Sequence, residues 1–355
     1  MTQTLHSYDS ERLSTYLEQH VAGFSGMAEI TKFSDGQSNP TYKLTDTTGS
    51  HFVLRAKPPG TLLKSAHAVD REFRVMTALA TSAVPVPKML HLSGEDSPMG
   101  AQFLVMEHLA GRVFWDPALP EQSPEFRRDA YHALVRTLAA LHDVDPRAVG
   151  LADFGKPGNY FSRQVSRWTG QYRACETQAR PDMDWSIDWL ERNMVQDDGQ
   201  ATIVHGDYRL DNVMFDADTP DMIAVLDWEL STLGHPFADL AYQCMGLRLP
   251  QDGMIKGLKG IDRTAQGLPE EAEYVAQYCA LRGIKPPENW VFYMVFSFFR
   301  LAAILEGVLH RAQSGNASNP RDIGMMSGTI NTLAEAAKHT AQATRAAEAA
   351  VDRTG

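Results

Sequence analysis

Short apolar runs separated by turn residues fill the first third of the chain, and this pattern predicts strands. The runs flank a small-residue turn at Ser34–Ser38 and recur at His51–Arg55, Lys88–Leu92 and Gln102–Met106. Helical periodicity appears over residues 9–20, where Asp9 and Ser10 form the expected cap, and again over Ser65–Thr81. The second helix is expected to present an apolar face of Val69, Phe73, Met76, Leu79 and Ala80. The pattern therefore predicts a sheet accompanied by helices.

Most of the remaining chain follows a helical period. Expected helices cover Ser123–Asp143, Gly158–Glu176, Trp185–Met194, Pro269–Arg282, Asn289–Ala312 and Gly324–Ala350. The run Trp290–Leu309 is nearly as apolar as a membrane span, but Arg300 and Glu306 interrupt it, so we predict a buried core helix and no membrane contact. A glycine-containing connector at residues 107–112 separates the two patterns. We therefore expect an α+β protein with one lobe at residues 1–107 and another at residues 108–355.

One stretch combines polar groups in a pattern typical of catalysis: His205-Gly-Asp-Tyr-Arg-Leu-Asp-Asn212, followed by Asp227-Trp-Glu229. Strand-like runs lead into and out of the first block and directly into Asp227, with turn formers at 216–221 between them. A loop, a hairpin and a strand end would bring Asp207, Asn212 and Asp227 together.

This oxygen-rich set suits Mg²⁺ better than zinc. The spacing His-x-Asp-x-x-x-x-Asn is that of a kinase catalytic loop, in which the aspartate accepts the hydroxyl proton of the substrate and the asparagine holds a metal ion. Taken singly, each residue could instead be a surface carboxylate, a turn amide or a strand cap. Together they predict Asp207 as the base and Asn212 and Asp227 as metal ligands.

The predicted N-terminal sheet offers a complementary phosphate site. The turn 34–38, which includes Ser38, could bring backbone amides close to phosphates, although an ordinary hairpin turn fits equally well. Arg55 at the end of a strand could reach the nucleotide, and Glu72 on the following helix could pair with it. Asp239 is expected to brace the catalytic loop by accepting backbone amides.

Composition excludes some function classes. The 355 residues carry 44 acidic and 33 basic side chains, a net charge of -11, with no basic stripe, so we expect no nucleic-acid partner. Three isolated cysteines and the lack of a basic-then-apolar N-terminal pattern indicate a reducing, cytoplasmic setting. The helix at 158–176 mixes aromatic residues with Arg163, Arg167 and Arg173. Its arginines are either solvated or line a site for an anionic group.

These motifs resemble the aminoglycoside phosphotransferase family. The resemblance rests on the stretches 36–42, Val53-Leu-Arg55, Asp70-Arg-Glu-Phe73, His205-Gly-Asp207 with Asn212, and Leu226-Asp-Trp-Glu229. The stretches 54–60, 65–72 and 163–168 are similar to the kinase-like domains attached to some acyl-CoA dehydrogenases and to their stand-alone bacterial relatives.

The resemblance implies a protein-kinase-like two-lobe fold, with an antiparallel N-terminal sheet and a mainly helical C-terminal lobe. It implies ATP as co-substrate, Mg²⁺ as cofactor and a small-molecule hydroxyl acceptor: a hydroxyacyl-CoA, or alternatively an aminoglycoside or amino alcohol. It places Met106, Glu107 and Leu109 at the adenine and assigns His205 to bracing of the loop. Two rival interpretations stay open, a metallohydrolase built on His205, Asp207, Asp227 and His235, and a catalytically silent nucleotide-binding protein.

Overall fold

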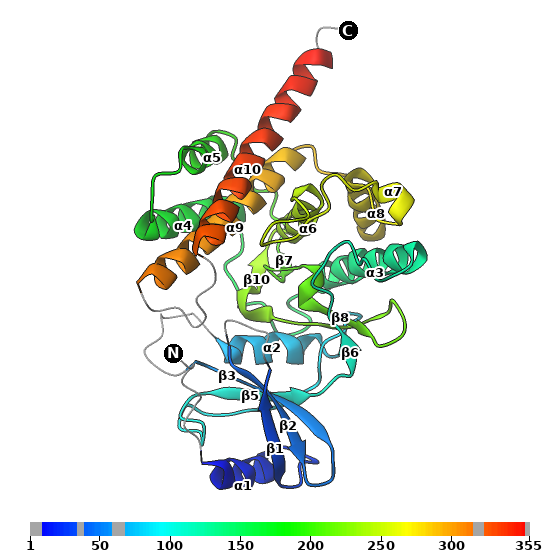
Figure 1. Cartoon of the computed structure of the whole chain (residues 1–355), viewed down its shortest axis with the longest axis vertical. Helices are drawn as coiled ribbons and strands as arrows, with labels where there is room; N and C mark the ends of the chain where they lie inside the picture. Colours follow the sequence, from blue (N-terminus) through cyan, green and yellow to red (C-terminus); the bar gives the residue numbers. More distant parts are fainter. Residues whose placement is uncertain (1–8, 34–38, 59–67, 315–322, 352–355) are drawn as a thin grey trace.

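The computed structural model describes residues 9–33, 39–58, 68–314 and 323–351. The chain forms two lobes, a sheet lobe at the N-terminus and a helical lobe at the C-terminus (Figure 1). This is the predicted α+β arrangement. The predicted turn at 34–38, with Ser38, lies outside the described residues.

The N-terminal sheet has five strands in the order β1-β2-β3-β5-β4, and every neighbouring pair is antiparallel. The strands are β1 Met27–Lys32, β2 Thr41–Asp46, β3 His51–Ala56, β4 Met89–Leu92 and β5 Phe103–Glu107. The helix α1, Ser10–His20, packs Leu13 and Leu17 against one face, and its first turn is capped by Asp9, as expected. The antiparallel sheet and the capped helix confirm the predictions for this lobe.

The other face of the sheet meets α2, Val69–Leu79. Because side chains alternate along a strand, Phe52 and Leu54 of β3 face α1 while Arg55 faces α2. The expected apolar face of α2 was partly wrong, since Ala80 is exposed and Val75 is buried. Glu72 lies within the buried stripe rather than beside it, because residues 69, 72, 76 and 79 share one helical face.

The helical lobe contains α3 to α10. Their bounds are α3 Pro124–Asp143, α4 Tyr160–Cys175, α5 Pro181–Arg192, α6 Phe237–Met245, α7 Arg263–Gln266, α8 Glu271–Arg282, α9 Trp290–Gln313 and α10 Ile323–Val351. The helix α9 is long and apolar enough to cross a membrane, but 72% of its most apolar window is buried inside the protein. It packs against α4, α5, α6 and α10, which confirms a core helix.

Two small sheets lie where the lobes meet (Figure 1). One has the order β6-β8-β9, with β6 Gly111–Arg112, β8 Val213–Asp216 and β9 Met222–Val225; the other pairs β7 Thr202–Val204 with β10 Thr232–Gly234. The predicted hairpin before Asp227 is therefore present as β8 and β9. The connection from β5 to β6 joins the two lobes, so the expected boundary near residue 107 lies at the end of a strand.

Candidate active site

Asp239 of α6 binds the backbone of the loop that joins β7 to β8. The buried Asp239 carboxylate accepts hydrogen bonds from the backbone N–H groups of His205 at 2.6 Å and Gly206 at 2.8 Å. Gly206 has φ +85°, and a Cβ there would lie 2.6 Å from the carbonyl oxygen of Leu230, so only glycine fits this turn. The predicted bracing contact of Asp239 is present.

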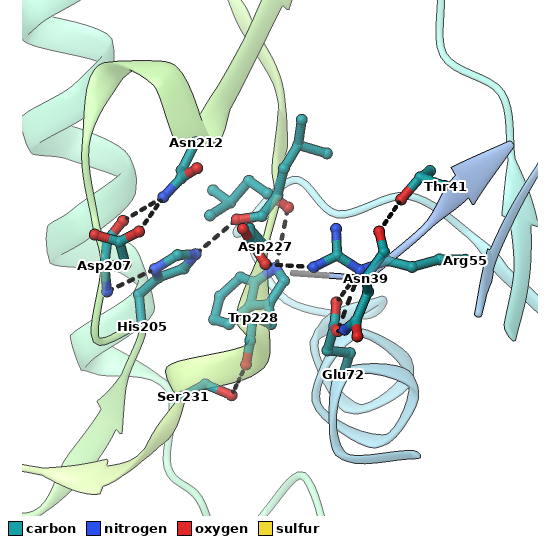
Figure 2. A network of polar contacts seen from close by, with 12 residues as sticks. Asn39, Thr41, Arg55, Glu72, His205, Asp207, Asn212, Asp227, Trp228 and Ser231 are labelled. Carbon is teal, nitrogen blue, oxygen red and sulfur yellow. Dashed lines mark hydrogen bonds and ion pairs between the residues drawn. The ribbon is translucent and has the colours of Figure 1, made fainter. Parts of the chain in front are cut away.

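His205 connects this loop to the end of β9. Its Nδ1 accepts the backbone N–H of Asp207 at 3.1 Å, and its Nε2 lies 2.8 Å from the carbonyl oxygen of Leu226 (Figure 2). The ring is fully buried and lies 4.7 Å, centroid to centroid, from that of Trp228. His205 thus has the loop-bracing position that was expected of it.

Asp207 is positioned by donors from its own loop. The side-chain amide of Asn212 donates to both the carbonyl oxygen and Oδ2 of Asp207, each at 2.8 Å. Arg209 places Nε 3.3 Å from Oδ1, and 22% of the Asp207 side chain remains exposed. Burial raises the pKa of Tyr242, and the nearby charge of Asp207 raises it further. The carboxylate is therefore oriented and still accessible.

Asp227 stands at the junction of the two lobes. Its backbone has φ 61° and ψ 62°, a left-handed conformation that is unusual outside glycine but tolerated by aspartate. Its Oδ1 lies 2.5 Å from Nη2 of Arg55, and 32% of the side chain is exposed (Figure 2). Ligand atoms of Glu72, Asp227 and Glu229 all lie within 4.8 Å of one another. Asp227 thus lies among carboxylates that could bind a metal ion and beside the guanidinium of Arg55.

Arg55 and Glu72 form the predicted ion pair, with Nε 3.1 Å from Oε2. Asn39 also donates to Glu72 Oε1 at 2.9 Å. Burial, assisted by the charge of Asp227, raises the pKa of Glu72 to about 7 against the opposing charge of Arg55. Burial alone would lower the pKa of Arg55, but the surrounding carboxylates Glu72 and Asp227 raise it overall, so the guanidinium stays charged.

The residues predicted to line the adenine lie where β5 leaves the sheet. Met106 and Glu107 end β5, and Leu109 follows in the half-buried connection to β6. The carboxylate of Glu107 accepts the backbone N–H of Lys88 at 2.8 Å. This places all three at the junction of the lobes; their contact with a nucleotide stays a prediction.

The four residues of the metallohydrolase interpretation do not form one centre. Both ring nitrogens of His205 are occupied by backbone groups. His235 accepts the N–H of Phe237 on Nδ1 and lies 3.3 Å from Asp198 on Nε2. A histidine whose two nitrogens are both occupied has none left for a metal ion. That interpretation was wrong in its choice of histidine ligands.

Sequence reasoning missed three residues of this site: Arg209, Tyr242 and Glu229. Arg209 lies between Asp207 and Asp211, with Nη2 2.9 Å from Asp211 Oδ2. The sequence offered a signal for two of them: Arg209 lies inside the catalytic motif, and Glu229 lies two residues after Asp227. Tyr242 left no such signal, because only the packing of α6 brings it to Asp207.

The chain matches a family described as the phosphotransferase enzyme family over residues 29–280. It is 47% identical over 311 residues to acyl-CoA dehydrogenase family member 10 of Mus musculus, covering 85% of this chain and 29% of that protein. It is 43% identical over 336 residues to acyl-CoA dehydrogenase family member 11 of Rattus norvegicus, covering 93% and 43%. The chain thus spans less than half the length of these relatives.

Solved structures show the same fold. A Ralstonia eutropha protein provisionally named an aminoglycoside phosphotransferase is 45% identical with a TM-score of 0.82, covering 93% of this chain and 98% of that one. Spectinomycin phosphotransferase, solved with ADP and spectinomycin, has a TM-score of 0.63 at 10% identity, covering 95% and 99%. The second likeness concerns the fold alone.

Proposed function

The chain belongs to the phosphotransferase enzyme family, and from this premise we propose that it transfers the γ-phosphoryl group of ATP to the hydroxyl of a hydroxyacyl-CoA in the cytoplasm. The observation that carries the proposal is the Asp207 carboxylate, which is held by Asn212 and remains partly exposed. A carboxylate oriented in this way can accept the proton of an acceptor hydroxyl as the new O–P bond forms.

The chain's own residues supply the remaining requirements. Arg55 carries a charge that its two carboxylates maintain, and it lies on the sheet face turned toward Asp227. A fixed cation there can offset the negative charge of nucleotide phosphates. Asp239 and His205 keep the loop rigid, so Asp207 needs no rearrangement before reaction.

The residues present fit a magnesium ion. The Nδ2 of Asn212 is committed to Asp207, while its Oδ1 has no hydrogen bond among the described residues. Asp227 and Glu229 add carboxylate oxygens. The backbone N–H of Leu226 donates to the carbonyl oxygen of Asn212 at 2.8 Å, so Asp227 follows directly on a residue bonded to the catalytic loop. Oxygen ligands of this kind suit Mg²⁺, which when bound would neutralise phosphate charge. We assign Asn212 and Asp227 as the residues that would hold it.

The acceptor class is suggested by the relatives. Two of them are named acyl-CoA dehydrogenase family members, and a hydroxyacyl-CoA is the member of that compound class that carries a hydroxyl to phosphorylate. The Ralstonia eutropha protein's name supports the second candidate, an aminoglycoside or amino alcohol.

The experiment is phosphoryl transfer from ATP with Mg²⁺, with the phosphorylated product identified by mass spectrometry, for wild type and Asp207→Asn. We expect turnover of the variant to fall by about 10²–10⁴-fold, because a positioned base contributes that much, with nucleotide affinity retained. The matched control is Asp218→Asn in the exposed β8–β9 turn, which should keep full turnover. Unchanged turnover in Asp207→Asn would exclude the base assignment. A lack of product with every acceptor class would favour a silent nucleotide-binding protein.

A further inference from the structure

Arg300 is a buried cation in the middle of α9. Only 4% of its surface is exposed. Its guanidinium carbon lies 5.6 Å from the ring centroid of Trp168 and 5.3 Å from that of Tyr242. With the residues that the structure describes, Arg300 forms no ion pair and no hydrogen bond. The other buried arginines of the described ranges, Arg127 and Arg180, each have several oxygen partners.

Two aromatic rings do not satisfy a guanidinium. Ring faces attract the charge, but the five N–H donors point outward in the guanidinium plane and need acceptors. A buried arginine without an acceptor is strongly disfavoured. None of the Arg300 nitrogens is both fully enclosed and without a partner. The small exposed surface of Arg300 therefore includes part of the guanidinium group. The guanidinium donors therefore remain open to an added acceptor.

Arg300 lies near the proposed catalytic base. The helices α4 and α6 both pack on α9, and Tyr242 of α6 connects Arg300 with Asp207. Because Tyr242 interacts with both groups, one acceptor that carries a hydroxyl and a negatively charged oxygen group can contact both of them.

Three arginines approach Tyr160 of α4, beside this junction. Burial raises the pKa of Tyr160 to about 12; the charges of Arg300, Arg163 and Arg167 oppose that rise, and the charge of Asp239 adds to it. Of these arginines, Arg163 is directed to the carbonyl oxygens of Lys156 and Pro157, and Arg167 is exposed over Trp168. Arg300 is thus the cation whose donors are left for a ligand.

We infer that Arg300 binds a negatively charged oxygen group of the acceptor, a carboxylate or a phosphate, and thereby selects anionic hydroxy compounds over cationic ones. This inference rests on the proposed function, because it takes Asp207 as the base for the acceptor hydroxyl. A cationic group of an aminoglycoside at this position would lie beside the like charge of Arg300, which is unfavourable.

The experiment compares acceptors that share one hydroxyl-bearing chain: 4-hydroxybutyrate, 4-hydroxybutyryl-CoA, its uncharged pantetheine thioester, 1,4-butanediol and 4-amino-1-butanol. The first two separate a carboxylate source from a phosphate source. We expect wild type to prefer one of them, and Arg300→Gln to raise its KM at least tenfold while the KM for ATP changes less than threefold. Arg300→Lys should recover part of the loss. Arg311→Gln, an exposed arginine on the same helix, should match wild type.

An equal loss of activity toward anionic and uncharged acceptors in Arg300→Gln, or a wild-type preference for the amino alcohol, would overturn the inference. If no acceptor is phosphorylated by wild type, the proposed function fails. The inference is then decided by calorimetric binding of butyrate and butyryl-CoA, which lack the hydroxyl. Binding of either anion that weakens tenfold in Arg300→Gln supports the inference, and binding of neither, or binding that the substitution leaves unchanged, overturns it.

Discussion

Asp239→Asn tests whether the catalytic loop depends on a single buried carboxylate. Asp239 accepts the N–H groups of His205 and Gly206 on separate oxygens, and His142 Nε2 lies 3.3 Å from Oδ2. An asparagine has one acceptor oxygen and one NH₂ group, so one backbone N–H would face another donor. The substitution keeps the size of the side chain and removes a hydrogen-bonding capacity that the loop uses.

The magnitude follows from those contacts. An unsatisfied buried N–H is unfavourable by about 1–3 kcal/mol, and the remaining bond loses about 1 kcal/mol of charge assistance. Removing a buried charge offsets part of this, because the neutral amide is less costly to desolvate. With this offset we expect the free energy of unfolding to fall by about 1–3 kcal/mol and, for a chain of 355 residues, the thermal midpoint to fall by roughly 1–4 °C. Turnover should fall at least tenfold, since small displacements of a catalytic group are costly.

Urea unfolding followed by tryptophan fluorescence is a suitable assay, because the buried Trp228 lies against His205. Asp252→Asn, which changes an exposed aspartate, is the matched control and should stay within about 0.5 kcal/mol of wild type. An Asp239→Asn protein as stable and as active as wild type would refute the view that Asp239 holds the loop.

Three further predictions concern the groups around this loop. Arg55→Met leaves the buried Glu72 without its cation, so it should lower the free energy of unfolding by about 3–5 kcal/mol. Adding Glu72→Gln should recover most of that loss. Equal instability of the single and double variants would contradict the pairing. Burial lowers the pKa of His142 below its usual 6.5, so the unfolded chain binds its proton first and stability is lost as pH falls below about 6.5. Urea midpoints at pH 7.5 and 5.5 should show a smaller acid loss in His142→Gln, by up to about 1.4 kcal/mol, and an unchanged loss would argue against a neutral buried ring. Asn212→Leu should raise the Mg²⁺ concentration for half-maximal turnover about tenfold, measured against EDTA-treated enzyme; an unaltered requirement would remove Asn212 as a ligand.

Local features of the sequence were sufficient to predict the contact between Asp207 and Asn212 in the catalytic loop. Asp207 and Asn212 are close enough along the chain that one turn of 3₁₀ helix, Leu210–Asn212, brings the amide onto the carboxylate. Strand alternation likewise decided the side of the sheet on which Arg55 lies, and helical spacing put Glu72 opposite it. These outcomes depend on backbone periodicity, which neighbouring residues encode.

The expected apolar face of α2 was less accurate, because periodicity within one helix carries no information about the other elements. A single-helix pattern ranks Ala80 as apolar and Glu72 as polar, but a buried ion pair makes Glu72 part of the interior. Periodicity alone does not show that a charge has a partner on another element.

Contacts between distant segments were decided only by the tertiary structure. The ion pair between Arg55 and Asp227 joins residues 172 positions apart across the two lobes. In the sequence Arg300 only interrupts an apolar helix. Its surroundings are known from the tertiary structure, which packs Trp168 of α4 and Tyr242 of α6 around it. By itself the sequence determined the periodic elements and the spacing of the catalytic loop, because backbone geometry repeats locally. Only packing decided which side chains meet across helices and lobes, because that depends on the shapes of all the elements together.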